Sequence, residues 1–328
     1  MKLDKAQVTS ILKKYGIVFV LFLIIIFLTI VRPEFMTAKN LFNVLNQTSI
    51  YGIMAIGMTF VIISSGIDLS VGSVLAFAGV VTASFAQVAT ATGKMFPNFG
   101  PLPIVVTILI ALGIGSLCGA INGFLVAKTN IHAFIATLGM QTIARGFALL
   151  YTGGKPVSNL SAGFEFIGSK LWGVVPVPVV IYAIVIALAW ILLNYTSFGK
   201  SVFAIGANKT AAAISGIKVQ RNQILIFTIA GLCAGLAAVV FLGRTGSAHP
   251  GAATGYELTA IAATTIGGTS QTGGIGTIWG AVVGALFLSV VKNGMTLMGI
   301  HAYWQQIVEG VIIITAVIID MRKNMKKV

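Results

Sequence analysis

Apolar runs recur along the whole chain, and this pattern constrains the fold more than any other feature. Runs of about 17 to 25 apolar residues cross a hydrocarbon core of about 30 Å as helices, because a helix satisfies its backbone hydrogen bonds internally. Only 9% of the 328 residues are charged and 57% are hydrophobic, whereas a soluble domain carries about a quarter charged residues. The chain is therefore predicted to be a single integral membrane domain, residues 1–328, with an all-α fold.

The hydropathy pattern predicts a polytopic bundle of about ten transmembrane helices. One candidate span, 258–266, would form only about 14 Å of helix, so it must either extend back through Glu257 or belong to a broken helix. The ten predicted spans are 17–31, 44–63, 71–88, 103–126, 131–151, 177–193, 224–242, 258–266, 277–291 and 303–319.

Basic residues cluster at three places that flank apolar runs, and they predict the orientation. The positive-inside rule places such clusters in the cytoplasm, and ten crossings bring both termini and the connection 196–221 to that side. Since the formal net charge of +14 is concentrated beside the spans, anionic lipid headgroups are the expected partner, and nucleic acid is not. The clusters are Lys2, Lys5, Lys13 and Lys14; Lys200, Lys209, Lys218 and Arg221; and Arg322, Lys323, Lys326 and Lys327.

Glycines spaced by four residues indicate how the helices pack. A helix face without side chains lets two backbones approach closely, which is a common mode of helix association in membranes. This spacing predicts a bundle and nothing about chemistry. The glycines are Gly115, Gly119 and Gly123; Gly231 and Gly235; and Gly276, Gly280 and Gly284.

No pattern in the sequence predicts an enzyme. Segment 194–201, NYTSFGKS, approaches the phosphate-binding pattern G-x-x-x-x-G-K-S, but Asn194 replaces the first glycine and an apolar span precedes it where a strand is required. The three histidines are far apart, and the acids form neither a D-x-x-D nor an H-E-x-x-H pattern. We expect a transport protein with no catalytic residue, metal site or cofactor of its own.

One predicted span carries polar side chains at helical spacing, and the last span carries Glu309. Thr137, Gln141 and Arg145 fall at i, i+4 and i+8 and share one face. Charge inside a membrane is costly and usually faces the bundle interior. Arg145 and Glu309 are both expected in the outer half, so they are predicted to pair or to face one cavity. A purely structural ion pair and snorkelling to the interface are the alternatives.

Two glycine-rich segments interrupt apolar runs, SSGIDLSVGS at 64–73 and GGTSQTGGIG at 267–276. Such paired breaks in the two halves of a transporter often mark unwound helix at the substrate path. For Asp68 a simpler role is capping: its carboxylate, or the hydroxyl of Ser70, accepts from backbone N–H groups where the next span begins. We favour capping at a membrane-surface turn over direct contact with a solute.

Four stretches of the chain form a characteristic series: GIDLSVGS at 66–73, FAIGANKTAAAISGIKV at 203–219, GYELTAIAATTIGGTSQTGGIGT at 255–277 and YWQQIVEGVIII at 303–314. They resemble the permeases of bacterial ABC importers for ribose, galactose and related monosaccharides, and the ribose type most closely. The similarity runs nearly end to end, with the motifs in the same order.

This resemblance implies a homodimeric permease that works with a cytoplasmic ATP-binding subunit and an extracytoplasmic sugar-binding protein in the bacterial inner membrane. ATP used by the partner would drive alternation between outward-facing and inward-facing states. The connection 196–221 would be the coupling element seated in the ATPase, with its contact residues at Thr210, Ala211, Ala212, Ser215 and Gly216.

The chain departs from the resembling family at three positions. Relatives commonly carry a glutamate in the coupling element, where this chain has Thr210-Ala211-Ala212 before Gly216. They also often carry an aspartate after Tyr-Glu-Leu, where this chain has Thr259, and a lysine at the position of Glu309. The first change removes one ionic contact to the ATPase, and the others bear on the choice of substrate.

A neutral sugar is recognised by amides, hydroxyls and aromatic rings, and a channel site that must release its cargo is expected to bind weakly. Other small polar cargoes, such as a nucleoside or a branched-chain amino acid, fit the same scaffold. An ion-coupled secondary transporter would need carboxylates near mid-membrane, with Asp68, Glu257 and Glu309 as the candidates. The predicted substrate-path residues are Asn46, Gln47, Asp68, Thr137, Gln141, Arg145, Tyr256, Glu257, Trp304 and Glu309.

Overall fold

The computed structural model describes residues 5–325, with side chains for residues 16–322. Lys2, Lys326 and Lys327 of the terminal basic clusters lie outside the described residues, and the side chains of Lys5, Lys13, Lys14 and Lys323 lie outside the described side chains. The elements are α1 Lys5–Val31, η1 Pro33–Met36, α2 Ala38–Ile63, α3 Val71–Ala86, α4 Ile104–Lys128, α5 Ala133–Thr152, β1 Val157–Ser158, α6 Ala162–Gly168, β2 Lys170–Leu171, β3 Val175–Pro176, α7 Val177–Tyr195, α8 Ser197–Ala207, α9 Lys209–Ile214, α10 Val219–Thr245, β4 Ser247–Ala248, α11 Tyr256–Ile266, α12 Ile278–Leu297 and α13 Ala302–Met325.

Each of the ten predicted spans coincides with a helix, which confirms the all-α fold. Within the described residues, seven helices are long and apolar enough to cross a membrane: α2, α4, α5, α7, α10, α12 and α13. Helix α3 is shorter, and Gly16–Val31 is the apolar part of α1. The number of crossings and the side on which the termini lie stay predictions.

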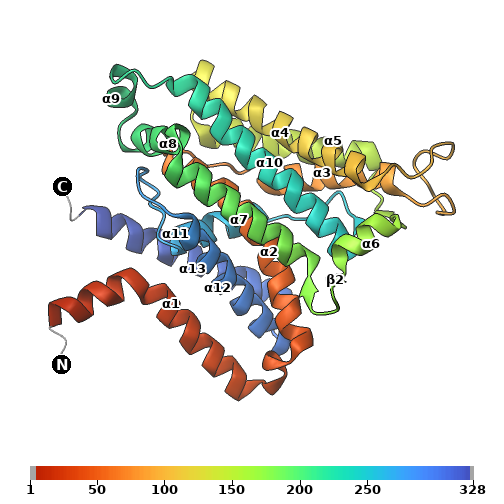
Figure 1. Ribbon diagram of the computed structural model, residues 1–328, viewed down its shortest axis with the longest axis horizontal. Coiled ribbons are helices and arrows are strands. Elements are labelled where there is room, and N and C mark those ends of the chain that lie inside the picture. The colour runs from red at the N-terminus through yellow and green to blue at the C-terminus, as the bar shows by residue number, and fades with distance from the viewer. Residues whose placement is uncertain (1–4, 326–328) are drawn as a thin grey trace.

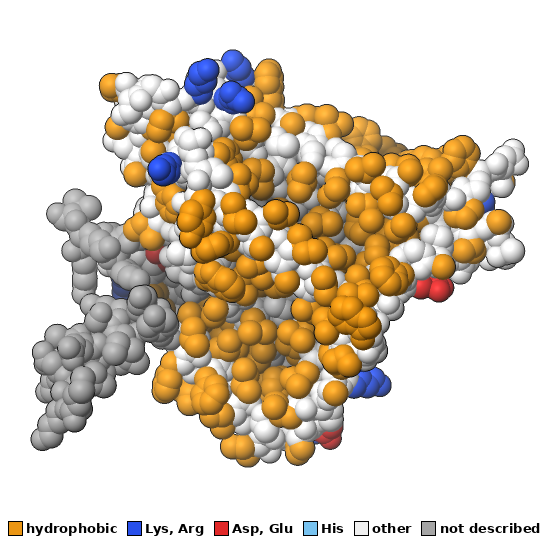
Figure 2. Space-filling view, in the orientation of Figure 1, with side chains coloured by type: hydrophobic (Ala, Val, Ile, Leu, Met, Phe, Trp, Pro, Cys, Tyr) orange, Lys and Arg blue, Asp and Glu red, His pale blue; other side chains and the backbone are white. Residues whose placement is uncertain are grey.

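Helix α2 lies at the centre of the bundle, with α10, α12, α11 and α7 packed around it (Figure 1). Its residues from Thr48 to Ile63 are buried without interruption. A helix that is apolar and buried on all sides is a core helix, not a lipid-facing one. Large apolar side chains instead cover the outside of the molecule (Figure 2), as expected of a surface that faces lipid tails.

Helices α4 and α10 form the closest helix pair, along the predicted glycine faces. A Cβ atom added to Gly115 would collide with the carbonyl oxygen of Gly231, and one added to Gly231 would collide with that of Gly115. Gly119, Gly123 and Gly235 approach the facing backbone in the same way. The predicted packing through small residues is confirmed here.

The short predicted span near Glu257 is a broken helix. Helix α11 has 11 residues, about 16 Å at 1.5 Å per residue. Segment 267–277 then runs without regular structure into α12, with Gly268, Gly273 and Gly274 at positive φ. Segment 249–255, which precedes α11, is also irregular. Irregular backbone at membrane depth is tolerated only where protein or a polar cavity surrounds it.

The connection between α5 and α7 carries the short helix α6. Strand β1 pairs antiparallel with β4, and β2 pairs with β3. Helix α6 packs against α10 and α7. These contacts tie the connection to the same end of the bundle as the start of segment 249–255.

Candidate functional site

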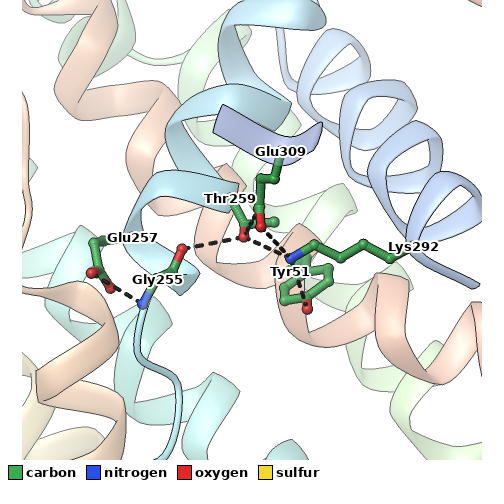
Figure 3. Close-up of polar contacts among 6 residues, drawn as sticks. All are labelled: Tyr51, Gly255, Glu257, Thr259, Lys292 and Glu309. Carbon is green, nitrogen blue, oxygen red and sulfur yellow. Dashed lines mark hydrogen bonds and ion pairs between the residues drawn. The ribbon is translucent and has the colours of Figure 1, made fainter. Parts of the chain in front are cut away.

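An ionic cluster of four side chains joins four helices inside the bundle (Figure 3). We call Tyr51 of α2, Thr259 of α11, Lys292 of α12 and Glu309 of α13 the ionic cluster. Lys292 Nζ lies 3.0 Å from Glu309 Oε2, and it donates to Thr259 Oγ1 over 3.1 Å and to the Tyr51 hydroxyl over 3.3 Å. Thr259 Oγ1 is also in hydrogen-bond contact with Glu309 Oε1.

The cluster compensates charge that would be costly in a membrane. The Lys292 and Glu309 side chains are 20% and 14% exposed, so the pair is largely but not fully shielded. The Lys292 ammonium also lies 4.7 Å from the centre of the Tyr51 ring. Tyr51 in turn makes an edge-to-face contact with Tyr256, with ring centres 4.8 Å apart.

The sequence reading missed Lys292, although its signal was present. The predicted span ends at residue 291, which places Lys292 just outside the membrane helix. Helix α12 in fact continues to Leu297, so the lysine lies within it. Thr259 and Glu309 are two of the positions at which the chain departs from the family it resembles, and they touch in space. Lys292 therefore pairs with a carboxylate that this chain presents on α13.

A second polar site surrounds Glu257 at the start of α11. Glu257 is 5% exposed, and its Oε1 accepts from Gln141 Nε2 over 3.1 Å and from the N–H of Gly255 over 3.2 Å. The other oxygen, Oε2, is buried without a hydrogen-bond partner in the described part of the chain. A Cβ atom on Gly72 would collide with Oε2. The motif GIDLSVGS thus supplies the glycine that makes room for Glu257.

The predicted pairing of Arg145 with Glu309 is wrong. Arg145 Nη1 donates to the carbonyls of Pro250 and Ala252, over 2.5 and 2.8 Å, while Glu309 pairs with Lys292. Both side chains had been assigned to one depth, but depth does not specify which helices are neighbours. Arg145 instead satisfies two backbone oxygens of the irregular segment 249–255, because backbone groups outside a helix need hydrogen-bond partners from the surrounding protein.

A cavity of about 410 Å³ opens beside this second site. Gln141 and Arg145 reach it from α5, and Glu309 is not among its lining residues. Its polar lining of hydroxyls, one amide and one guanidinium can exchange hydrogen bonds with a small hydroxylated solute. The lining residues are Ser73, Gln141, Thr142, Arg145, Gly146, Leu149 and Thr254.

Asp68 and Thr137 fix the conformation of the first break, which is the glycine-rich segment 64–73; the second break is segment 267–276. Asp68 is 1% exposed, and its Oδ1 accepts from the N–H and the hydroxyl of Ser70 over 2.8 and 2.6 Å. The carboxylate thus bonds the N–H of Ser70, the N-cap residue of α3, whose own side chain caps no backbone N–H. The turn is buried in protein, and its place at the membrane surface stays a prediction. Asn122 donates to the Ser70 hydroxyl over 2.9 Å. Thr137 Oγ1 accepts from the N–H of Leu69 over 3.1 Å.

The other predicted path residues lie in three different settings. Tyr256 belongs to the aromatic pair with Tyr51, and Gln47 lies beside both tyrosine hydroxyls. Asn46 is half-buried, and its Oδ1 has no partner within the described residues. Trp304 is 62% exposed at the start of α13 and does not line the cavity beside Gln141 and Arg145.

The predicted coupling element folds into two short helices, α8 and α9. Asn208 Oδ1 accepts from the N–H of Ala211 over 2.9 Å and caps α9. Ala212 is buried, whereas Thr210, Ala211 and Ser215 are exposed. Gly216 follows α9 with φ at +83°, a conformation that side chains with a Cβ disfavour. Segment 194–201 consists of the end of α7, Thr196 and the start of α8.

The two breaks meet each other against α8. The N–H of Gly274 donates to the carbonyl of Ile63 over 2.8 Å, and Ser65 Oγ lies 3.1 Å from the carbonyl of Thr272 and 3.0 Å from that of Gly206. A Cβ atom on Gly206 would collide with the carbonyl of Ile63. Both interruptions of the bundle therefore rest on one helix of the predicted coupling element.

Comparison with known families agrees with a bundle built for transport. The profile of the family "Branched-chain amino acid transport system / permease component" matches residues 40–317. The chain belongs to this family. The permease is therefore a transport subunit, not an enzyme, and a multi-pass protein of the bacterial inner membrane.

The permease is similar to curated proteins over nearly its whole length. It is 42% identical to the ribose import permease protein RbsC of Escherichia coli (strain K12), over 93% of this chain and 92% of the relative. It is 39% identical to RbsC of Bacillus subtilis (strain 168), over 96% and 95%. It is also 39% identical to the galactose/methyl galactoside import permease protein MglC of Haemophilus influenzae, over 99% of both chains. No solved structure matches the chain.

Proposed function

We propose that the permease imports a monosaccharide of the ribose type, driven by ATP. The observation that carries this proposal is the 42% identity to a ribose import permease across 93% of the chain. The polar cavity beside Gln141 and Arg145 suits a hydroxylated solute. A branched-chain amino acid is the second candidate cargo because the family description names it, and a nucleoside is the third.

The proposed assembly contains two copies of the permease, a cytoplasmic ATP-binding subunit and an extracytoplasmic sugar-binding protein. ATP is used by the partner, and this chain carries no cofactor. The proposal has ten crossings, both termini and the connection 196–221 in the cytoplasm, and lipids on the apolar faces. The seven membrane-length helices of the described residues support the multi-pass part of it. The import function of the curated relatives supports this assembly.

The solute path runs past the two polar sites. Sugar hydroxyls exchange hydrogen bonds with the amide of Gln141 and with the groups around Tyr256, while Asp68 and Thr137 position the first break. Binding is weak, because a path that delivers cargo must also release it. The full proposed set is Asn46, Gln47, Asp68, Thr137, Gln141, Arg145, Tyr256, Glu257, Trp304 and Glu309.

Helices α8 and α9 are the proposed contact with the ATP-binding subunit. The exposed residues Thr210, Ala211 and Ser215 offer the docking face, with Ala212 packed beneath and Gly216 closing the turn. A shift of α8 moves both breaks, because Ser65 and Ile63 contact it directly. This connection links ATP binding to alternation of the solute path.

The deciding experiment is uptake of labelled ribose into proteoliposomes that contain the permease. Cognate ATP-binding subunit, sugar-binding protein and internal ATP are added singly and together, and unlabelled galactose, leucine and adenosine compete in separate samples. Uptake only with all components, and competition only by sugars, is the expected result.

Two outcomes would overturn this proposal in different ways. Competition by leucine or adenosine in place of sugars would change the cargo and leave the energy coupling intact. Uptake by the permease alone under a proton or sodium gradient would make it an ion-coupled secondary transporter, with Asp68, Glu257 and Glu309 as its candidate ion sites.

A further inference from the structure

A cavity of about 630 Å³ lies where α4 ends and α10 begins. Lys128 in the last turn of α4 lines it together with Lys218 and Arg221 at the start of α10. Ala213 of α9 lies on its rim. The cavity therefore joins three elements at one end of the bundle, away from both polar sites described above.

The three cations of this cavity have no acidic partner within the described side chains, where the one ion pair is Lys292 with Glu309. Lys128 Nζ donates to Gln220 Oε1 over 2.9 Å, which orients the ammonium group and leaves its charge uncompensated. The described acids all lie elsewhere and none lines the cavity. Figure 2 shows basic side chains gathered at this end of the molecule.

The remaining wall of the cavity is apolar. Ile217, Ile224 and Leu225 line it, and Leu225 is 40% exposed. Three cations beside an apolar wall, at the end of two membrane-length helices, match an amphiphile that has an anionic head and a hydrocarbon body. Basic pockets between transmembrane helices at the cytoplasmic boundary bind anionic lipid headgroups for this reason.

We propose that this cavity binds the headgroup of an anionic phospholipid of the cytoplasmic leaflet. The phosphodiester oxygens accept from Lys128, Lys218 and Arg221, as charge-assisted hydrogen bonds, and the start of an acyl chain lies against Ile224 and Leu225. The assignment to this leaflet rests on the orientation given in the proposed function; the site itself does not depend on the cargo.

Occupancy of the site has a mechanical consequence. Ala213 belongs to α9, whereas Lys128 and Arg221 belong to α4 and α10. A bound lipid therefore contacts α9 of the coupling element together with the closely packed helices α4 and α10, and it stabilises their relative position. A soluble phosphate ion would meet the same cations but would leave the apolar wall uncovered.

The test measures lipid retention by the purified full-length permease, using native mass spectrometry after exchange into neutral detergent with phosphatidylglycerol or phosphatidylcholine. The wild type is expected to retain one phosphatidylglycerol in clear preference to phosphatidylcholine. The triple variant Lys128→Gln, Lys218→Gln, Arg221→Gln should lose at least about tenfold of that preference, because it removes all three cations that attract the headgroup.

A matched control removes three exposed cations that do not line the cavity, Lys155→Gln, Lys200→Gln and Lys209→Gln, and it should retain the lipid like the wild type. The variant Lys128→Arg, Lys218→Arg keeps the charges and should also retain it, which separates lost binding from lost folding.

Three results would overturn the proposal. Equal retention by the wild type and the triple glutamine variant would remove the lipid from this cavity. Displacement of the lipid by millimolar inorganic phosphate would make it a site for a free anion. If the triple glutamine variant retained the lipid but no longer bound the ATP-binding subunit, the three cations would belong to that protein contact.

Discussion

The hydroxyl of Ser65, in the first break of the bundle, donates to the carbonyl of Gly206 in α8 over 3.0 Å. This bond joins positions that are far apart in the chain, and the contact of Gly274 with Ile63 brings the second break to the same place. The segments that interrupt the membrane helices therefore contact the proposed ATPase-coupling helix directly.

Replacing Gly206 tests this contact. Gly206→Ala places a Cβ against the carbonyl of Ile63, so we expect a loss of about 1–3 kcal/mol of stability, as in other overpacked sites. ATP hydrolysis by the assembled transporter should continue while ribose uptake falls. The control is Gly113→Ala, whose added Cβ meets nothing within 4 Å. Unchanged coupled uptake in Gly206→Ala would disprove the link between α8 and the two breaks.

Gly216 supports the turn after α9 through its backbone conformation. Gly216→Val must adopt φ near +83°, which costs about 1–2 kcal/mol for a residue with a Cβ, and the distorted α9 should uncouple hydrolysis from uptake. Gly216→Asn is the control, because asparagine tolerates this region. Both activities are measured in the same proteoliposomes, and coupled uptake by the valine variant would contradict the assignment of this loop.

The ion pair of Lys292 with Glu309 is expected to behave as a unit. Lys292→Met leaves Glu309 without its cation and should lower stability by about 1–3 kcal/mol, less than for a fully buried pair, because the side chains are 20% and 14% exposed. Adding Glu309→Leu should recover most of that loss. Thermal unfolding in detergent measures both variants, and additive losses in the double variant would show that the pair contributes nothing.

The contact of Thr259 with Glu309 predicts that charges can be exchanged between helices. Glu309→Lys alone places a second ammonium beside Lys292 and should lower the melting temperature through like-charge repulsion. Adding Thr259→Asp supplies a carboxylate at the adjacent position and should restore it. A double variant that melts as low as the single one would show that residues 259 and 309 do not compensate each other.

Arg145 is expected to close the irregular segment 249–255. Arg145→Lys shortens the cation and removes the planar donor that reaches Pro250 and Ala252, so the segment should open. The readout is maleimide labelling of Thr254→Cys after both buried cysteines are replaced by alanine; we expect a severalfold faster rate. Lys155→Gln serves as the control. Equal labelling rates for Thr254→Cys alone, with Arg145→Lys and with Lys155→Gln would contradict this role of Arg145.

The helices could be predicted because hydropathy and length report on crossing a membrane directly. What could not be predicted is lateral position: Arg145 and Glu309 are expected at one depth, but Arg145 bonds Pro250 and Ala252 whereas Glu309 pairs with Lys292. Lys292 was missed because it lies just beyond the predicted end of its span. The meeting of Ile63 with Gly274 depends on the fold of the long chain between them, which no local pattern contains.

The glycine seam between α4 and α10 also constrains how the permease is made. More than one hundred residues separate the facing glycines Gly115 and Gly231 along the chain. Because a ribosome supplies α4 well before α10, the glycine face of α4 must wait in the lipid until its partner has been inserted. This contact therefore cannot form before α10 has been synthesised, and a nascent chain that stops before α10 lacks it altogether.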